Sequence, residues 1–515
     1  MNLLLLILIL TICSIKTLGF HTRTIKKRKN PVVLAMTADP VPSAPQASYS
    51  KGLEGMFDDE IKRIAYPALL SCFIEPLAIN IESLFVGRLG NSQSLAALGI
   101  ATSVMRLWFY SWKSITYSAT TLIGRNRNNI ENRNNRSKNR ENYHLLKSTM
   151  SQCSLGLGVI LTILLQVFSK PILALFNVSP DLNQLLFEET LSYYRIKATA
   201  APAMMYILVN DGISRGNGDT KTPLIAASIG IIIQLLIQSN IKIASTYNLS
   251  IIKLTALASL FSSIATALFY SYLNFKKIPI VTNKKEKDDN SNNNSNNNGN
   301  NNDNNNTAIK KSIIESNSAL FIKNLTLMGF WAYIAPQVTK ISNTAAGTHQ
   351  WLLSMFVINC IGHESLGIAA QVMFAKYPRL RGSTLKKKFL DISRKIGVLE
   401  SLTMFITSFI IYPKLFIRDQ SIINSIRIPS IITILMMIPT SYVIVSEGML
   451  LGIGEFSLLC KNICISVLSS SILVKLVLHS GFTVFNSALG SVWLSITTMF
   501  LIRAILVHFN LKNIK

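Results

Sequence analysis

Two acidic residues, Glu75 and Glu82, lie seven positions apart in an otherwise apolar part of the chain. On an α-helix this spacing is about two turns, so both carboxylates lie on nearly the same face. A carboxylate in lipid is costly unless it is protonated, paired or exposed to a water-filled cavity. We therefore expect Glu75 and Glu82 to bind and release a proton or a sodium ion. The alternative for Glu82 is a solvated position at the membrane interface.

Other isolated polar residues interrupt apolar stretches. Asp211 and Glu447 lie near the ends of two stretches, where they could act in gating or form solvated ion pairs with basic loops. Glu364 follows His363 near the middle of another stretch, and this pair falls short of a metal site, so cavity lining or an interhelical hydrogen bond is expected. Pro76 lies inside a predicted helix, where its missing N–H favours a kink that could act as a hinge. The alternative is that the proline has no such role and is tolerated because neighbouring helices satisfy the freed backbone groups.

The sequence does not carry the patterns of an enzyme. It has no Ser-His-Asp arrangement, dinucleotide fingerprint or G-x4-GK[ST] loop, and its six cysteines lack the C-x2-C spacing of a zinc site. We therefore expect no catalytic residue, no metal site and no cofactor. The net charge of +26 does not indicate nucleic-acid binding, because Lys and Arg fall between long apolar stretches. Such charge is typical of loops that face an anionic membrane surface.

Long apolar stretches position these candidate residues. Of 515 residues, 49% are hydrophobic and 15% charged, as in a membrane protein. Stretches of this length can satisfy their backbone in lipid only as helices. We predict an all-α, polytopic membrane protein with twelve transmembrane helices. The expected spans are 61–84, 95–123, 146–168, 187–213, 223–244, 251–273, 318–341, 348–374, 390–412, 428–453, 457–479 and 484–508.

The basic residues orient these spans. Lys and Arg gather in the loops after the second, sixth and eighth spans. In a twelve-span arrangement these loops lie on the side that holds both termini. The positive-inside rule places that side in the cytosol or stroma.

An internal repeat divides the chain. Two copies of six helices in one orientation are typical of parallel-repeat secondary transporters. An Asn-rich, low-complexity segment between the copies predicts a disordered linker. We expect a signal and transit-like leader over 1–57, a six-helix lobe over 58–275, the linker over 276–312 and a second, pseudo-symmetric six-helix lobe over 313–515. The repeat has a constant offset of 236 residues and pairs Tyr206, Asp211, Gly212, Gly216, Gly218 and Asp219 with Tyr442, Glu447, Gly448, Gly452, Gly454 and Glu455.

The first residues predict a targeting leader. Residues 1–19 carry an apolar run that is too short to span a membrane, as in a signal peptide. The next segment is basic and has no acidic residue before Asp39, as in a transit peptide. With Phe20 between them, the order resembles the bipartite plastid leaders of algae with secondary plastids. We therefore expect a plastid membrane, with the plasma membrane or an endomembrane as the alternative.

Several spaced segments resemble the multidrug and toxic compound extrusion (MATE) family, in the branch that includes the bacterial DNA-damage-inducible protein F and the plant plastid detoxification proteins. The first predicted helix carries Glu75-Pro76-Leu77, Glu82 and Val86-Gly87-Arg88-Leu89-Gly90 in the family's order. The stretch 194–224 is similar to the family's fourth helix and following loop. In the second half, AAGTHQ, SLGIAAQ and SEGMLLGIGEF have counterparts. The resemblance covers residues 58–508.

The resemblance implies a cation-coupled antiporter, driven by H+ or Na+, that exports small organic solutes by alternating access. Glu82 takes the place of the family's coupling acid, with Glu75 beside it. The chain departs from the family in its fifth helix, where Gln234, Gln238 and Asn240 replace an Asn/Asp pair and leave half of the cation site open. The expected partners are a small-molecule substrate and membrane lipids, without nucleic acid, and the expected state is a monomer. The residues expected at the substrate cavity or its gates are Asp211, Glu364, Gln371 and Glu447.

The sequence favours two other functions less than transport of a small solute. A flippase for a lipid-linked precursor would require a cavity rich in cations, and Arg88, Lys197 and Lys323 are too few to favour it. A membrane receptor or membrane-embedded enzyme would require an extramembrane ligand domain or a catalytic constellation, and the sequence indicates neither.

Overall fold

A computed structural model describes residues 46–131, 136–176, 178–181, 183–240, 249–276, 298–377, 384–411, 420–484 and 486–512. Across these ranges the chain is helical and forms no β-strand. The first half contains α3 (Gln46–Leu89), α4 (Ser92–Trp112), α5 (Ser114–Glu131), α6 (Arg136–Val167), α7 (Ser169–Ala174), α8 (Gln184–Ala198), α9 (Ala201–Gly216), α10 (Lys221–Ser239) and α12 (Ile251–Lys276). The second half contains α13 (Asn298–Thr339), α14 (Asn343–Asn359), α15 (Ile361–Lys376), α16 (Thr384–Phe405), the π-helix η2 (Ile406–Ile411), α18 (Gln420–Ile453), α19 (Phe456–Ser480) and α20 (Ala488–Lys512).

The helices account for the expected spans. Within the described residues, eight single helices are long and apolar enough to cross a membrane, and α14 with α15 adds a ninth crossing bent by 41°. The expected second, fourth and ninth spans are also composed of consecutive segments: α4 with α5, α8 with α9, and α16 with η2. The twelve-span arrangement is therefore consistent with the fold. The chain is a multi-pass integral membrane protein.

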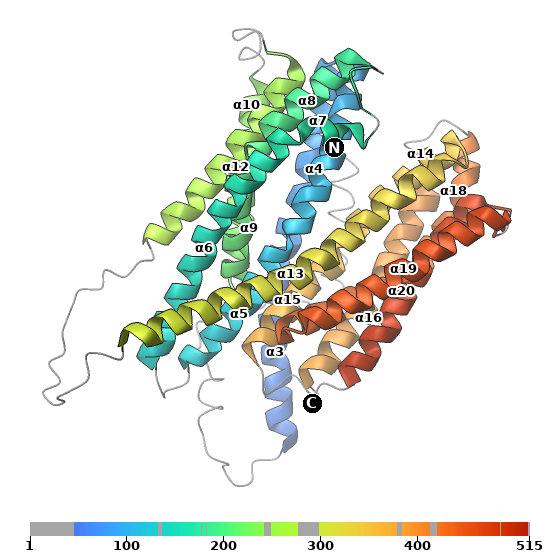
Figure 1. The fold of residues 1–515 in the computed structure, drawn as a ribbon. Coiled ribbons are helices and arrows are strands. Elements are labelled where there is room, and N and C mark those ends of the chain that lie inside the picture. Colours follow the sequence, from blue (N-terminus) through green and yellow to red (C-terminus); the bar gives the residue numbers. More distant parts are fainter. Residues whose placement is uncertain are drawn as a thin grey trace, which may run out of the picture.

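The spans form two bundles (Figure 1). The first-half helices lie on one side and the second-half helices on the other, and the bundles diverge toward the upper end of the view. Helix α13 begins beneath the first bundle and crosses to the second, so it contacts α4 and α5 as well as α19. Helix α5 ends low in the view, and α12 ends at the left, about half-way down. We call the bundles the N-terminal lobe (α3–α12) and the C-terminal lobe (α13–α20).

Repeated glycines bring equivalent helices together in the two lobes. A Cβ on Gly212 of α9 would lie 2.6 Å from the Thr116 carbonyl oxygen of α5. Its repeat partner Gly448 of α18 lies against the backbone of Gly367 in α15. Small residues allow such close backbone approach between membrane helices. Both lobes therefore use the same crossing, which is why the sequence repeat is strongest here.

The second and eighth spans each consist of two consecutive helices. Helix α4 ends before Lys113, and α14 ends before Cys360. The turns after α9 and α18 also match, because Gly218 and Gly454 both have positive φ, 71° and 83°. In the first of these turns Asp219 accepts hydrogen bonds from the Lys221 and Thr222 amides, so Asp219 caps α10.

Some boundaries differ from those expected. Helix α13 begins at Asn298, so residues 298–312 are helical although the linker was expected to extend to 312. An apolar membrane helix is a nucleus from which weak helix formers can continue a helix, because propagation costs less than nucleation. Helix α3 begins at Gln46, inside the expected 1–57 leader. Residues 1–45, which contain the expected signal and transit segments, and 277–297 lie outside the described residues.

The glycine crossings give a testable prediction. Gly212→Ala or Gly448→Ala should each destabilise the protein by about 1–3 kcal/mol, because the new methyl group meets backbone that cannot yield easily. Gly329→Ala on α13 is the matched control, since a Cβ there would have nothing within 4 Å. The measurement is the thermal unfolding temperature of the purified protein in detergent. Equal temperatures for all three variants would contradict the crossing geometry.

Candidate functional site

Glu82 lies on α3 inside the N-terminal lobe and is 3% exposed. The Tyr193 hydroxyl donates to its Oε2 at 2.9 Å, and the Lys197 ammonium lies 3.3 Å from the same atom. The Gln234 side-chain amide donates to its Oε1 at 3.2 Å. These partners come from α8 and α10, so three helices meet at one carboxylate. The alternative of a solvated Glu82 is therefore wrong, because neighbouring helices cover it.

The residues of this cluster satisfy one another's charges and hydrogen bonds. Lys197 also donates to the Tyr193 hydroxyl at 2.8 Å, one helical turn away on α8. A buried carboxylate is tolerated when it is paired and its oxygens accept hydrogen bonds. Lys197 supplies the compensating charge, and the three donors occupy both carboxylate oxygens. A proton that bound Glu82 would neutralise it and release Lys197 from the pair.

Glu75 lies in a more open setting on the same helix. Its Oε2 is 3.0 Å from the Lys113 ammonium, and the two side chains are 42% and 32% exposed. Lys113 is the residue at which the second span breaks between α4 and α5. Two acids on one face of α3 thus have separate lysine partners and different exposure. The structure does not bring Glu75 and Glu82 into one site.

Pro76 lies within α3, which continues as one helix from Gln46 to Leu89. Asn80 donates its side-chain amide to the Pro76 carbonyl at 2.7 Å. The proline is therefore accommodated inside a continuous helix, and its role as a hinge stays a prediction.

The matched acids of the repeat each pair with the last helix of their own lobe. The Tyr270 hydroxyl of α12 donates to Asp211. Glu447 is 5% exposed and accepts hydrogen bonds from Arg503 of α20 at 2.8 and 3.1 Å. Lys323 of α13 lies 3.8 Å from the other Glu447 oxygen. The alternative of a solvated ion pair is therefore wrong for Glu447, which is buried among three helices.

Gln371 connects the two lobes. Its side-chain amide on α15 donates to the Tyr117 carbonyl at 2.8 Å and to the Thr121 hydroxyl at 2.9 Å, both on α5. The Thr121 hydroxyl in turn donates to the Leu451 carbonyl of α18 at 2.8 Å. These contacts join the lobes near the end that carries the basic loops. Gln371 therefore lies at the junction between the lobes.

Contacts from α3 and α13 extend this junction. Lys376 and the Tyr377 hydroxyl both donate to Glu60 of α3, at 2.8 and 2.6 Å. The Ser118 hydroxyl of α5 donates to Asn317 of α13 at 2.7 Å. The lobes are therefore held together at the basic end by polar contacts that can be exchanged for water.

His363 and Glu364 do not act together. Glu364 is exposed, whereas the buried His363 ring lies 2.6 Å from Glu400 of α16. In the described part of the chain, no three His, Cys, Asp or Glu residues lie together as metal ligands would.

Sequence reasoning missed several charged partners. Lys113, Glu400 and Arg503 were given no role, although each interrupts an apolar stretch. That signal is the same one that identified Glu75 and Glu82, because any charge in a membrane span requires compensation. At the fifth helix, Gln234 completes the Glu82 cluster, Gln238 is buried without a hydrogen-bond partner in the described structure, and Asn240 is the C-cap of α10.

An open groove among the described helices lies away from these groups. It has a volume of about 420 Å³ and a mostly apolar lining from α6, α9 and α12. Its polar residues are Tyr206, Ser271 and Asn274. It holds none of the paired acids, so we assign it no part in the candidate site.

Comparison with known proteins identifies similar folds and sequences. Residues 67–239 match the family model MatE. The chain is similar to three Arabidopsis thaliana proteins named DETOXIFICATION: number 44, chloroplastic, at 26% identity over 36% of this chain; number 43, at 26% over 35%; and number 45, chloroplastic, at 20% over 81%. The matches cover 35%, 43% and 72% of those proteins, so the chain spans less than half the length of the first two.

Solved structures share the fold. A crystal structure of a MATE protein in a bent conformation superposes with a TM-score of 0.71 at 16% identity, covering 92% of this chain and 99% of the other. A Vibrio cholerae MATE transporter, VcmN, superposes with a TM-score of 0.73 at 11% identity, covering 89% and 97%. A MOP superfamily transporter from Pyrococcus furiosus, whose binding pocket is described as reversed in polarity, gives 0.70 at 17%, covering 88% and 94%.

The Glu82 cluster predicts a specific pattern of stability. Lys197→Met should destabilise the protein by about 3–5 kcal/mol, because it leaves the Glu82 carboxylate buried without a cation. The double variant Glu82→Gln with Lys197→Met should recover most of the loss. The measurement is the thermal unfolding temperature in detergent.

The matched control for this prediction is Lys311→Met. Lys311 lies 4.0 Å from Glu315 on α13, with side chains 75% and 67% exposed, and such pairs contribute little. If Lys197→Met were as stable as Lys311→Met, or if the double variant recovered nothing, the pairing would be contradicted.

Proposed function

We propose that this chain belongs to the MATE family and is a secondary transporter rather than an enzyme. It exports small organic molecules across a membrane in exchange for a cation. The observation that carries the proposal is the buried Glu82 carboxylate, held by Lys197, Tyr193 and Gln234 inside one lobe of a two-lobe membrane protein. A buried ionisable group within membrane helices that can change partner is what coupling to an ion requires.

The coupling step is an exchange of partners at Glu82. With Lys197 bound, the pair has no net charge, and the cluster ties α3 to α8 and α10. When a cation binds the carboxylate instead, Lys197 loses its partner and must reach water or another acceptor. Binding of the cation therefore favours a different arrangement of these three helices. A ligand can shift a conformational equilibrium only by such a difference in affinity between the states.

The surroundings of Glu82 support a proton over a sodium ion. A sodium site requires several oxygen atoms arranged around the ion, as other hard cations do. Around Glu82, Lys197 and the amide nitrogen of Gln234 are donors, and the Tyr193 hydroxyl donates to the carboxylate. A proton requires only the carboxylate. We therefore assign the coupling to H+ and treat Na+ as the alternative.

The junction at the basic end supports alternating access. Gln371, Thr121 and Glu60 join the lobes there, whereas the bundles diverge toward the opposite end (Figure 1). These contacts must break for a substrate to enter from the side of the basic loops. Gln371 is thus assigned to the gate, while Asp211 and Glu447 hold each lobe together from within. Glu364 is exposed and available to the substrate path.

We propose the location and the substrate from the relatives and from the expected leader. Two relatives are named chloroplastic, and the expected leader fits a plastid membrane, which is the location we propose. The substrate is a small organic molecule, the surrounding partner is the lipid bilayer, and the working unit is a monomer without a cofactor. A flippase is disfavoured because Lys197 and Lys323 are engaged with acids and do not form a free cationic surface.

Glu82→Gln tests the function directly. The amide keeps the volume and one acceptor oxygen but cannot exchange a proton. In proteoliposomes, the wild type should drive efflux of ethidium or of carboxyfluorescein, a cationic and an anionic probe, under a pH gradient. Glu82→Gln should bind probe but lose gradient-driven efflux, whatever the pH.

Glu75→Gln is the comparison on the same helix. Because Glu75 is partly exposed and paired separately, its variant should keep a pH-driven flux that is at most modestly slower. Efflux driven by a sodium gradient alone would show that the coupling ion is Na+ and not H+. Loss of coupling in Glu75→Gln with normal coupling in Glu82→Gln would move the site to Glu75, and no gradient-driven flux of any probe in the wild type would contradict the transporter function.

A further inference from the structure

The C-terminal lobe contains a second buried acid at a break in a membrane span. The eighth span breaks at Cys360, between α14 and α15, with a bend of 41°. Glu400 of α16 lies beside this break, and its Oε1 accepts the His363 backbone N–H at 3.0 Å. The first amides of a helix lack partners within the helix and favour a negative charge. Glu400 thus caps α15 from another helix.

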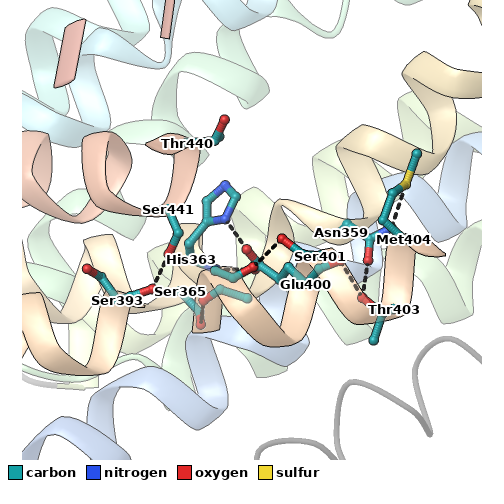
Figure 2. A network of polar contacts seen from close by, with 12 residues as sticks. Asn359, His363, Ser365, Ser393, Glu400, Ser401, Thr403, Met404, Thr440 and Ser441 are labelled. Atoms are coloured by element: carbon teal, nitrogen blue, oxygen red, sulfur yellow. Dashed lines mark hydrogen bonds and ion pairs between the residues drawn. The ribbon is translucent and has the colours of Figure 1, made fainter. Parts of the chain in front are cut away.

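The His363 side chain completes this contact. Its Nδ1 lies 2.6 Å from the other Glu400 oxygen, and the two side chains are 0% and 3% exposed. Figure 2 shows the imidazole reaching from α15 to the carboxylate, with its second ring nitrogen turned away from Glu400. That nitrogen, Nε2, is buried and has no hydrogen-bond partner in the described structure. Gly362 makes room for the arrangement, because a Cβ there would lie 2.6 Å from Glu400 Oε1.

The remaining neighbours do not supply a permanent charge to the pair. On α18, Ser441 is a buried neutral group that donates to the Ser393 carbonyl of α16. On α14, Asn359 accepts a hydrogen bond from Thr403 of α16 at 2.5 Å. Glu364 on α15 and Cys360 at the break interact electrostatically with Glu400. Arg503 of α20, which interacts with Cys360, is already bound by Glu447 of α18.

The charge of the pair therefore depends on one proton. With that proton, the pair is either an imidazolium with a carboxylate or an imidazole with a carboxylic acid, and its net charge is zero. Without it, a carboxylate is left buried with hydrogen bonds but no cation, which is costly in a low-dielectric interior. Either microstate binds the same proton, and the pair titrates as a unit.

We propose that His363 and Glu400 form a second proton-binding site, in the C-terminal lobe and separate from the Glu82 cluster. The site belongs to the break of α15, the helix that also carries the interlobe contact of Gln371. Release of its proton leaves a net negative charge between α15, α16 and α18, which disfavours the closely packed state. Its part in the transport cycle rests on the proposed transporter function, whereas proton binding itself does not.

Counting protons on the purified full-length protein tests the site without any substrate. The protein in detergent is titrated between about pH 5 and pH 8, the range in which an ordinary histidine side chain changes its charge. Glu400→Gln should bind about one proton fewer than the wild type, because an imidazole beside a neutral amide in a buried site stays uncharged. The double variant His363→Asn with Glu400→Gln should show the same loss. The double variant replaces the pair with two amides that can still hydrogen-bond to each other. It should therefore stay folded while both titrating groups are removed.

Ser441→Ala is the matched control, since it removes a hydrogen bond between α16 and α18 and no titrating group. Its proton count should equal that of the wild type. An unchanged count in both Glu400 variants would show that the pair is only a helix cap and would overturn the proposal.

Transport measurements separate this proposal from the coupling at Glu82. In proteoliposomes, Glu400→Gln should lower the number of protons moved per probe molecule while flux continues, whereas Glu82→Gln should stop gradient-driven flux. If Glu400→Gln binds one proton fewer in the titration but moves the same number of protons per probe molecule, the site has only a structural role. Absence of flux in the wild type would contradict the transporter function. The proton count would then still test whether His363 and Glu400 bind a proton.

Discussion

Compensation of buried charge organises this membrane protein. Glu82 with Lys197, Glu447 with Arg503 and Glu400 with His363 each join different helices, at distances of 2.6 to 3.3 Å. In lipid an uncompensated charge is so unfavourable that each acid requires either a cation from a neighbouring helix or a proton. Each pair thus fixes how two helices pack. The same constraint allows a proton to change that packing, because it removes the need for the partner.

The two lobes share a backbone plan but differ in their charges. The glycine pairs Gly212 with Gly448 and Gly218 with Gly454 occupy equivalent crossings and turns. Both lobes also break their second span, yet Lys113 meets an acid of α3 at one break, whereas His363 meets an acid of α16 at the other. The two lobes therefore share the close backbone approaches, which tolerate few substitutions, and differ in their ionisable groups.

The sequence predicted the features that depend on local pattern. Apolar length indicated the spans, the offset of 236 residues indicated the repeat, and isolated acids indicated Glu75 and Glu82. It could not predict the partners, because Lys197 is 115 residues from Glu82 and Glu400 is 37 residues from His363. Pairing over such separations depends on how helices pack. Isolated charges could have identified Lys113, Glu400 and Arg503 as candidates, but not which acid or base each one meets.

The central claim is that Glu82 exchanges Lys197 for a proton. Infrared difference spectroscopy of the protein in lipid, recorded as the pH is lowered, detects the protonated carboxyl group itself. The account predicts a carbonyl band of a protonated carboxyl group in the wild type that is missing from Glu82→Gln. The same band in Glu82→Gln, or no difference between the two proteins at any pH, would contradict the assignment of coupling to Glu82.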